Sequence, residues 1–379
     1  MLGLLLIVIA LIAYGSLYPW QFDFSRHVDP LHLLLHNWPP VDRFLLRDVA
    51  INVLLYVPLG VLAVLALRPR RRMRIPTVLA AVALGFVFSA SMELLQAYDD
   101  HRTTSPVDLA TNTLGAFAGA LLALIYEPAA ASLLKSRGAR RLGTSGAVLA
   151  VCWAGFQFYP FFPNFSIHRL RVAVSLLAHT GNISPLEMWA GASEWLALAL
   201  ALEAFLGRFR TVWLGALMLC VSMRIFIVTR SLSWNDLLAA GLALALWIVI
   251  PKRLRLAAIL PMTLSAVLLR ELAPFHFSDH PAAFTWIPFG GTLESERQVA
   301  VVIMARKAFN YGAAVWLLRE AGWSYVRAGA GVAAALFALE LLQRYLPGRT
   351  PESTDAVLAL LMTLALWLAD RPAARGVSA

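Results

Sequence analysis

Two stretches of the sequence place acids, an amide and an arginine at identical spacing. Residues 92–108 read MELLQAYDDHRTTSPVD and residues 339–355 read LELLQRYLPGRTPESTD, so they share Glu, Leu, Leu, Gln, Tyr, Arg, Thr and Asp without a gap. Carboxylates accept hydrogen bonds from hydroxyl or ammonium groups, and an arginine fork binds phosphate or carboxylate. The shared pattern therefore predicts that the chain binds a polar head group.

The candidate binding residues form two sets. The first set is Glu93, Gln96, Arg102, Asp108 and Asn112, and the second is Glu340, Gln343, Arg349 and Asp355, with Ala359 opposite Asn112. Residues 93–112 and 340–359 are identical at eight positions in twenty, where composition alone would give roughly two. This similarity indicates an internal repeat.

A third, weaker copy lies between the other two. Residues 220–236, CVSMRIFIVTRSLSWND, align with residues 92–108 and keep Arg230 and Asp236 opposite the first copy's Arg and Asp. Val221 and Arg224 replace the Glu and the Gln. Arg and Asp thus recur in all three copies, whereas Glu and Gln recur in two.

A purely structural role for the Arg and the Asp is an open alternative. Ser105 and Asp108 have the spacing of a capping box, and Ser233 and Asp236 repeat it. Arg102 would then neutralise Glu93 or Asp108 and hold a helical hairpin together. Capping does not explain the Glu and the Gln, so the pattern favours a ligand-binding role for that pair.

No catalytic motif accompanies these residues. The sequence lacks a nucleotide-binding loop, a Gly-x-Ser-x-Gly elbow and a His-Glu-x-x-His helix. Cys152 and Cys220 each lie inside an apolar run, which argues against a structural disulfide or a zinc site. We therefore expect no cofactor, no metal and no catalytic residue, and an enzyme is the less favoured class.

The elements that position these residues are predicted to be membrane-spanning helices. Of the 379 residues 60% are apolar and 14% charged, whereas soluble domains carry about a quarter charged residues. Apolar runs long enough for a bilayer core recur along the whole chain. We expect an all-α polytopic membrane protein with about twelve transmembrane helices, near residues 2–18, 47–67, 75–97, 107–126, 144–160, 187–207, 211–229, 234–250, 254–273, 298–318, 325–345 and 354–369.

Charge distribution predicts the orientation of these helices. The net charge is +10, and the basic residues concentrate in short loops after even-numbered spans, as the positive-inside rule requires. This placement argues against a nucleic-acid partner and predicts that both termini are cytoplasmic. The loops that carry the two candidate sets would face the other side of the membrane.

The repeats have a second landmark. A Pro-aromatic motif begins at Leu17, at Phe158 and at Leu272, each time just after an apolar run. Proline disfavours helix continuation, and aromatic residues suit the membrane interface. The chain is thus predicted to consist of three tandem parallel four-helix repeats, at residues 1–143, 144–252 and 253–379.

The first repeat resembles the VanZ-like family of bacterial membrane proteins. The resemblance rests on NVLLYVPLG at 52–60, SMELLQ at 91–96, Arg102, Asp108 and the Asn112-x-x-Gly115 element. The third repeat shares its Glu, Gln, Arg and Asp but lacks the final Asn and Gly. The family is named for a protein associated with glycopeptide resistance, so the resemblance implies a location in the bacterial plasma (inner) membrane and a cell-envelope role. It implies no reaction.

Several function classes remain open. The leading hypothesis is a multi-pass protein that binds a polar head group at the non-cytoplasmic face, with membrane lipids, a cell-wall precursor or a glycopeptide as partners. The alternative is a transporter or flippase of an envelope lipid or small amphiphile, and it requires a polar cavity that reaches the membrane midplane. An intramembrane enzyme would need a nucleophile or metal beside the Glu, Arg and Asp. A scaffold would need only the structural contacts.

Overall fold

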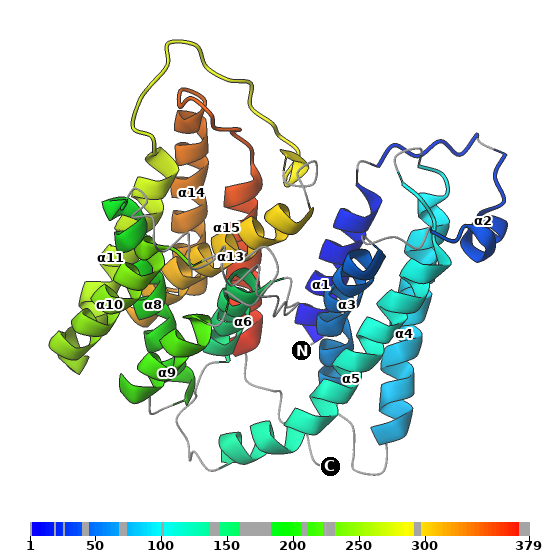
Figure 1. Ribbon diagram of the computed structural model, residues 1–379, viewed down its shortest axis with the longest axis horizontal. Coiled ribbons are helices and arrows are strands. Elements are labelled where there is room, and N and C mark those ends of the chain that lie inside the picture. Colours follow the sequence, from blue (N-terminus) through cyan, green and yellow to red (C-terminus); the bar gives the residue numbers. More distant parts are fainter. Residues whose placement is uncertain are drawn as a thin grey trace, which may run out of the picture. The chain divides into compact units, whose positions relative to one another are not determined.

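The described part of the chain is helical. The computed structural model describes residues 2–18, 20–25, 27–39, 45–67, 74–99, 102–135, 144–159, 183–206, 211–222, 224, 232–291 and 297–370. Within these ranges the regular elements are helices, and only isolated bridges pair Phe22 with Asp99 and Thr285 with Glu352 (Figure 1). The prediction of an all-α protein is confirmed.

Each of the twelve predicted spans falls on a helix. Between them lie the short helix α2 (Pro30–His36) and the 3-10 turn η3 (Lys252–Leu254). The twelve helices are α1 (Leu2–Leu17), α3 (Leu45–Leu67), α4 (Arg74–Gln96), α5 (Pro106–Lys135), α6 (Ser145–Phe158), α8 (Pro185–Leu206), α9 (Thr211–Ser222), α10 (Trp234–Val249), α11 (Arg255–Leu272), α13 (Arg297–Glu320), α14 (Tyr325–Gln343) and α15 (Thr354–Asp370).

Fewer of these helices qualify as membrane spans on their own. A bilayer core of about 30 Å needs about 20 residues at 1.5 Å per residue. Among the described residues, α4, α5, α8, α13 and α14 are long and apolar enough, which gives five candidate spans. Helices α10 and α11 add a sixth if they form one span, although they meet at a bend of 115°. The structure therefore supports a membrane protein with five or six candidate spans, and the predicted number of twelve is not confirmed.

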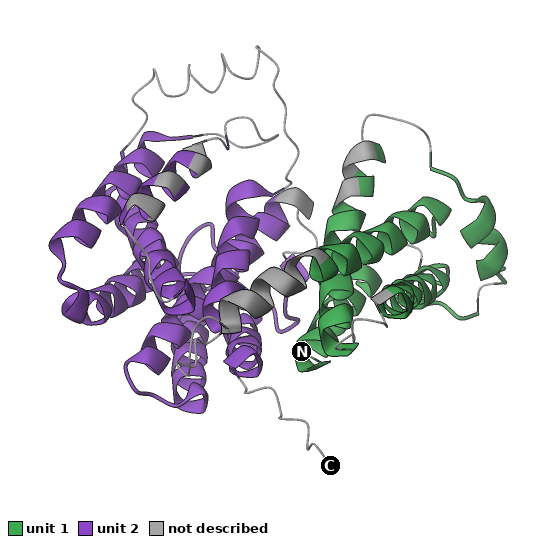
Figure 2. Ribbon diagram, turned by 90° about the horizontal axis from the view of Figure 1, so that it is seen from below, with its two compact units in different colours: residues 1–141 green, residues 142–379 purple. Residues whose placement is uncertain are grey.

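The chain divides into two compact units, residues 1–141 and 142–379 (Figure 2). The division falls two residues before the predicted end of the first repeat at 143. The predicted boundary at 252 lies inside the second unit, between α10 and α11, where it stays a prediction.

Glycines determine how closely the helices of the first unit approach. A Cβ atom on Gly115 would lie 2.2 Å from the carbonyl oxygen of Val53, and one on Gly119 would lie 2.1 Å from that of Val57. Helices α3 and α5 thus meet backbone to backbone, as small residues allow within membranes. This contact places the polar residues of α3 and α5 next to each other.

The second unit repeats the helix contacts of the first and contains further helices. In the first unit α1 packs on α3 and α4, and α5 packs on both of these. In the second unit α11 packs on α13 and α14, and α15 packs on both of these. The further helices among its described residues are α6, α8, α9 and α10, and α8 contacts α6, α10, α11 and α13.

Candidate functional site

In the first unit, the predicted Gln and Arg hold the end of helix α1. Arg102 donates from Nε to the carbonyl oxygen of Tyr18 at 2.7 Å and from Nη2 to that of Gly15 at 3.1 Å. Gln96 donates from Nε2 to the carbonyl oxygen of Ser16 at 2.6 Å. The last carbonyls of a helix have no partner within it, and arginine side chains can supply one. These two residues thus connect α1 to the hairpin of α4 and α5.

Glu93 holds the start of helix α5. Its Oε2 atom accepts a hydrogen bond from the backbone N–H of Ser105 at 2.9 Å, and its side chain is buried. Thr104 adds a bond from its hydroxyl to the carbonyl oxygen of Glu93 at 2.9 Å. In the predicted capping box Asp108 would have bound the N–H of Ser105, and Glu93 binds it instead. Glu93 therefore does cap a helix start through one carboxylate oxygen, although capping was not expected to explain this residue.

Asp108 and Asn112 connect α5 to the two neighbouring helices. Asn52 of α3 donates from Nδ2 to Oδ1 of Asp108 at 2.8 Å. Asn112 donates from Nδ2 to the hydroxyl of Ser89 on α4 at 3.0 Å. The predicted hairpin does bring the five residues of the first set to one end of the unit, where their described bonds join helix ends and helix pairs.

The second set makes the same contacts in the second unit. Arg349 donates from Nε to the carbonyl oxygen of Ala273 at 3.0 Å and from Nη2 to that of Arg270, both at the end of α11. Gln343 donates to the carbonyl oxygen of Glu271 at 3.2 Å. Glu340 accepts at Oε2 from the N–H of Glu352 at 3.0 Å. Each bond has a counterpart at the aligned positions of the first unit.

Asp355 differs from Asp108 in the charge of its surroundings. Lys307 on α13 stands where Asn52 stands on α3, and its Nζ lies 2.6 Å from Oδ1 of Asp355. The hydroxyl of Tyr311 lies 2.6 Å from Oδ2 of Asp355 and 3.0 Å from Oε1 of Glu271. An uncharged amide thus faces Asp108 in the first unit, whereas a cation faces Asp355 in the second.

The weaker middle copy keeps one of these contacts in altered form. Ser16, Gln157 and Glu271 each stand three residues before the proline of a Pro-aromatic motif. Arg224, at the position of Gln96, donates from Nη1 to Oε1 of Gln157 at 2.8 Å. It also forms an ion pair with Asp236. In all three copies the same pair of positions is therefore in contact.

The predicted capping box of the middle copy is confirmed. The hydroxyl of Ser233 accepts from the N–H of Asp236, and the carboxylate of Asp236 accepts from the N–H of Ser233 at the start of α10. Arg230, the residue aligned with Arg102, lies outside the described residues.

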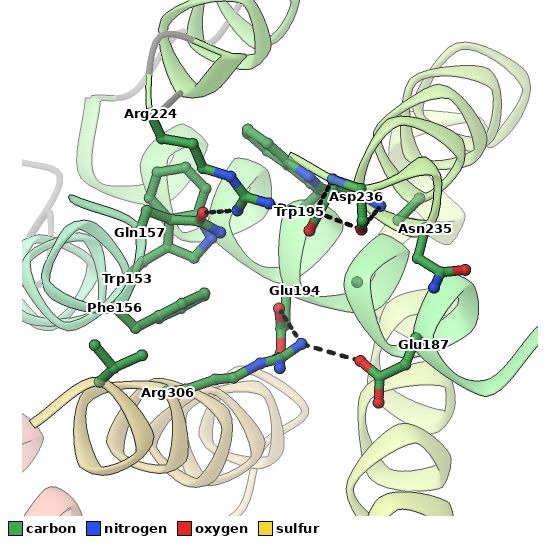
Figure 3. Close-up of a pocket in the computed structure, with 14 residues that line it drawn as sticks. Trp153, Phe156, Gln157, Glu187, Glu194, Trp195, Arg224, Asn235, Asp236 and Arg306 are labelled. Atoms are coloured by element: carbon green, nitrogen blue, oxygen red, sulfur yellow. Dashed lines mark hydrogen bonds and ion pairs between the residues drawn. The ribbon is translucent and has the colours of Figure 1, made fainter. Parts of the chain in front are cut away.

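The second unit contains a cavity of about 300 Å³ with charged walls (Figure 3). Arg306 points toward Glu194 and Glu187, while Arg224 points toward Gln157 and Asp236. The residues that line the cavity come mainly from α6, α8, α10 and α13. They are Trp153, Phe156, Gln157, Glu187, Gly191, Glu194, Trp195, Arg224, Ser233, Asn235, Asp236, Ala239, Val302 and Arg306. This is a polar cavity between helices that are otherwise apolar.

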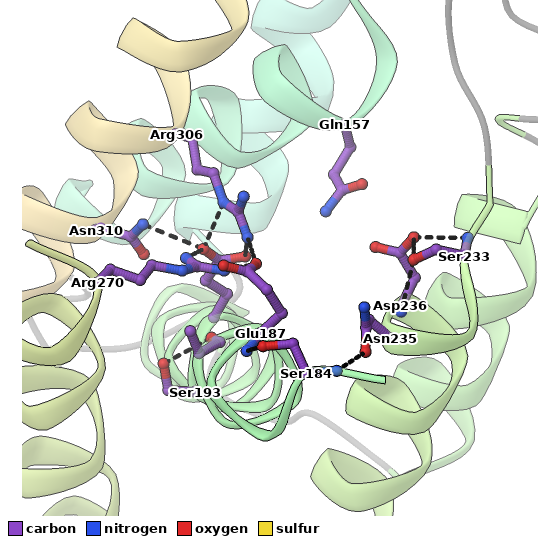
Figure 4. A network of polar contacts seen from close by, with 12 residues as sticks. Gln157, Ser184, Glu187, Ser193, Ser233, Asn235, Asp236, Arg270, Arg306 and Asn310 are labelled. Carbon is purple, nitrogen blue, oxygen red and sulfur yellow. Dashed lines mark hydrogen bonds and ion pairs between the residues drawn. The ribbon is translucent and has the colours of Figure 1, made fainter. Parts of the chain in front are cut away.

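Two arginines share two carboxylates at this cavity. Arg270 approaches Glu194 at 2.5 Å and Glu187 at 2.8 Å. Arg306 approaches Glu194 at 2.9 Å through Nε, and Asn310 donates to the same carboxylate at 3.1 Å. Figure 4 shows Arg270, Arg306 and Asn310 close to Glu187. Because Glu194 is buried and its oxygens face charged donors, the bonds are of the strong, charge-assisted kind.

A second cavity, of about 260 Å³, adjoins the first. It shares Glu187 and Arg306 with the first cavity, and its lining also includes Ala266, Val267, Arg270, Glu271, Ile303, Lys307, Asn310, Tyr311 and Arg349. Arg349 is the predicted site residue that lines it. The predicted Gln343 and Asp355 contact its lining residues Glu271 and Lys307.

Sequence reasoning missed most of the charged residues at these cavities. None of the five, Glu187, Glu194, Arg270, Arg306 and Lys307, is among the binding residues predicted from the sequence. A signal was present, because ionisable residues inside apolar runs are rare and face protein or water. Among the described residues, no group of three or more His, Cys, Asp or Glu side chains is placed to hold a metal ion.

Comparison with known proteins supports the first unit's assignment. Residues 1–127 match the model of the VanZ/LLP1 family, which is 127 of the 379 residues. The match covers most of the first unit and confirms the resemblance that its motifs indicated. No curated protein and no solved structure shows significant similarity to the chain.

Proposed function

We propose that the chain is a bacterial plasma-membrane protein of the cell envelope whose second unit binds the polar head group of an amphiphile. The ligand class is a lipid, a lipid-linked cell-wall precursor or a glycopeptide. The match to the VanZ/LLP1 family and the long apolar helices support the membrane and envelope part of this proposal. The charged cavities support the binding part.

One observation carries the proposal, namely the depth of the Glu194–Arg306 pair. Glu194 is the tenth residue of the 22 in α8, and Arg306 is the tenth of the 24 in α13. Nine residues of helix correspond to roughly 14 Å, about half of a bilayer core. Charges at such a depth are costly and mark a functional site by default. The side chain of Arg306 is 38% exposed, so its guanidinium remains accessible from the cavity.

The cavity residues have complementary roles in this proposal. Arg306 and Arg349 would donate to phosphate or carboxylate oxygens, because a guanidinium fork matches both groups. Glu187, whose side chain is 41% exposed, would accept from hydroxyl or ammonium groups of the ligand. Both ends of a zwitterionic or sugar-phosphate head group would then find partners.

The first set of predicted residues takes a different part in this proposal. A ligand role for Glu93, Gln96, Arg102, Asp108 and Asn112 stays a prediction. Their described bonds support a structural role in the first unit, where they connect α1, α3, α4 and α5. In the second unit Glu340, Gln343 and Asp355 would support the cavity rather than touch the ligand.

The equivalent contacts also support three parallel repeats, with boundaries at 143 and 252 as the sequence predicts. In that arrangement the twelve helices would all belong to four-helix units with the same orientation, and both termini would be cytoplasmic. The ends of α1, α6 and α11 would then face the non-cytoplasmic side. The start of α8, with Glu187, would face that side too, so the ligand would enter from outside.

Binding can be tested on the purified full chain. The wild type, Arg306→Gln and Arg319→Gln would be placed in nanodiscs of bacterial total lipid and examined by native mass spectrometry for retained lipid. Arg319 lies on the same helix but is exposed and lines neither cavity. We expect Arg306→Gln to lose retained lipid and Arg319→Gln to keep it. Equal retention in all three proteins would refute a head-group site at Arg306.

A cellular experiment separates the two sets of residues. Alanine substitution of Glu187, at unchanged expression, should alter envelope lipid composition or glycopeptide sensitivity. Alanine substitution of Gln96, also at unchanged expression, should leave both at wild-type values if the first set is structural. The opposite result would restore the ligand-binding role to the first unit.

Transport is a second candidate, because the cavity lies at about half the length of α8 and α13. A flippase requires a polar cavity near the membrane midplane, and the depth of the Glu194–Arg306 pair favours one. The assay is movement of a head-group-labelled lipid between leaflets of reconstituted vesicles, compared with Arg306→Gln vesicles. A binding protein without transport would leave the rate at the level of protein-free vesicles.

A further inference from the structure

Three oxygen atoms at the edge of the second cavity form a chain. The hydroxyl oxygen of Tyr311 lies 2.6 Å from Oδ2 of Asp355 and 3.0 Å from Oε1 of Glu271. Tyr311 is 1% exposed, Glu271 is 7% and Asp355 is 0%. A tyrosine hydroxyl carries one hydrogen, so it can donate to one of the two carboxyl groups. The second short contact therefore needs a hydrogen of its own.

From this geometry we propose that the Glu271–Tyr311–Asp355 chain is a proton-binding site. With one added proton, Tyr311 donates to one carboxylate and the other carboxyl group, now protonated, donates to the hydroxyl oxygen of Tyr311. Without it, one of the two contacts would set a carboxylate against an oxygen lone pair in a buried place. Two buried carboxylates that share one site commonly hold one proton between them.

The neighbouring residues place the added proton on Glu271. Lys307 lies 2.6 Å from Oδ1 of Asp355 and stabilises its ionised form. Glu271 instead accepts the neutral amide of Gln343 at Oε2, at 2.8 Å. A neutral Glu271 carboxyl group can keep this bond and still donate from its other oxygen to Tyr311.

The other charged groups nearby do not supply a second cation to the chain. They are Glu187 and Glu194 on α8, Arg270 on α11, Arg306 on α13, Glu340 on α14, and Arg349 and Glu352 in the loop before α15. The guanidinium of Arg270 binds Glu187 and Glu194, and that of Arg349 donates to two carbonyl oxygens at the end of α11. The ion pair that Lys307 makes is with Asp355. The chain thus has two carboxyl groups and one cation in contact with it.

The proton site opens into a cavity. Glu271, Lys307 and Tyr311 all line the space of about 260 Å³ that adjoins the larger cavity. A proton on Glu271 can therefore exchange with that space without passing through the packed core. Glu187 and Arg306, which line both cavities, connect this space with the proposed head-group site.

The first unit provides a natural control for this inference. Ser16 stands at the position of Glu271, and Asn52 stands at the position of Lys307. The first unit thus has Asp108 but no carboxyl group at the position of Glu271. The proposal depends on residues of the third copy and does not require that the cavity bind a head group.

The experiment is infrared spectroscopy of the full chain in nanodiscs, which detects the carbonyl stretch of protonated carboxyl groups. We expect a protonated-carboxyl band in the wild type that is lost or reduced in Glu271→Gln and retained in the control Asp108→Asn. The band should shift when the buffer is changed to D₂O, because the proton exchanges through the cavity. A Glu271→Gln spectrum identical to the wild type would overturn the proposal.

A second variant keeps the test decisive if Glu271→Gln fails to fold. Tyr311→Phe removes the hydroxyl that accepts from Glu271 and leaves both carboxyl groups in place. We expect the band to change position in this variant, because the carboxyl group of Glu271 loses its hydrogen bond to the hydroxyl of Tyr311. An unchanged band in Tyr311→Phe, or a band that is lost only in Glu340→Gln, would assign the proton elsewhere and refute the proposal.

Discussion

Replacing Lys307 should destabilise the second unit by an amount that depends on whether the new residue can still donate. In Lys307→Leu, the buried carboxylate of Asp355 loses a charge-assisted partner at 2.6 Å. Removing one partner of a buried pair costs roughly 3–5 kcal/mol. Because the side chain of Lys307 is 27% exposed and Asp355 keeps its bond to Tyr311, we expect the lower end, about 3 kcal/mol.

The matched variant takes its residue from the first unit. Asn52 holds Asp108 there at 2.8 Å with a neutral amide, so Lys307→Asn retains a donor for Asp355. The amide–carboxylate bond is still a hydrogen bond to a charged group, which contributes about 1.5–3 kcal/mol, but the attraction between opposite charges is lost. We therefore expect Lys307→Asn to cost about 1–2 kcal/mol, clearly less than Lys307→Leu.

A double variant separates the loss of the pair from the loss of packing. Lys307→Leu combined with Asp355→Asn removes both charges, and we expect it to recover at least about 1 kcal/mol relative to Lys307→Leu alone. Stability would be measured by graded SDS unfolding of the full chain in mixed micelles, followed by tryptophan fluorescence. If Lys307→Leu and Lys307→Asn unfold at the same SDS fraction, the ionic contact does not contribute and the reasoning is refuted.

Four further variants test the helix contacts by thermal unfolding in detergent. Gly115→Ala places a Cβ atom 2.2 Å from the carbonyl of Val53 and should cost about 1–3 kcal/mol, whereas Gly241→Ala, with nothing within 4 Å, should stabilise α10 by up to about 1 kcal/mol. Arg102→Met removes two hydrogen bonds at the end of α1 and should lower the free energy of unfolding by about 2 kcal/mol. An unchanged stability would contradict the structural role of Arg102. Ser233→Ala removes a capping box and should cost about 1 kcal/mol, and an unchanged midpoint would contradict the cap.

The helices were predictable because apolar runs and their breaks are written directly in residue types. All twelve predicted spans fall on helices of the structure. The number that crosses a membrane was less predictable, because it depends on bends that side chains do not encode. The turn of 115° between α10 and α11 occurs around Pro251 to Leu254, where the sequence shows only a basic loop between two apolar runs.

The candidate site was predictable in its grouping and not in its partners. The hairpin does gather Glu93, Gln96 and Arg102, but Arg102 and Gln96 donate to backbone carbonyls of α1. A carbonyl acceptor has no residue type, so a sequence pattern cannot reveal it. Glu93 caps a helix start twelve residues further on, and this distance hides the cap from local pattern rules.

The charged residues at the cavity were not predicted from the sequence for a different reason. Glu194 and Arg306 are each conspicuous inside an apolar run, yet their partnership needs α8 and α13 to be neighbours. The three-repeat hypothesis rests on similarity between stretches of sequence, whereas this site lies between α8 and α13, which belong to different predicted repeats. Glu194 and Arg306 do not belong to the shared pattern, so similarity between the copies does not reveal them.

Arg270 takes part in two networks at once, and this has a mechanical consequence. Its carbonyl oxygen accepts from Arg349 in the loop before α15, while its guanidinium binds Glu187 and Glu194 at the cavities. A ligand that draws the two carboxylates away would release the guanidinium and loosen the last turn of α11. The loop would then be free to shift, so occupancy of the interior could be signalled at the surface through a single residue.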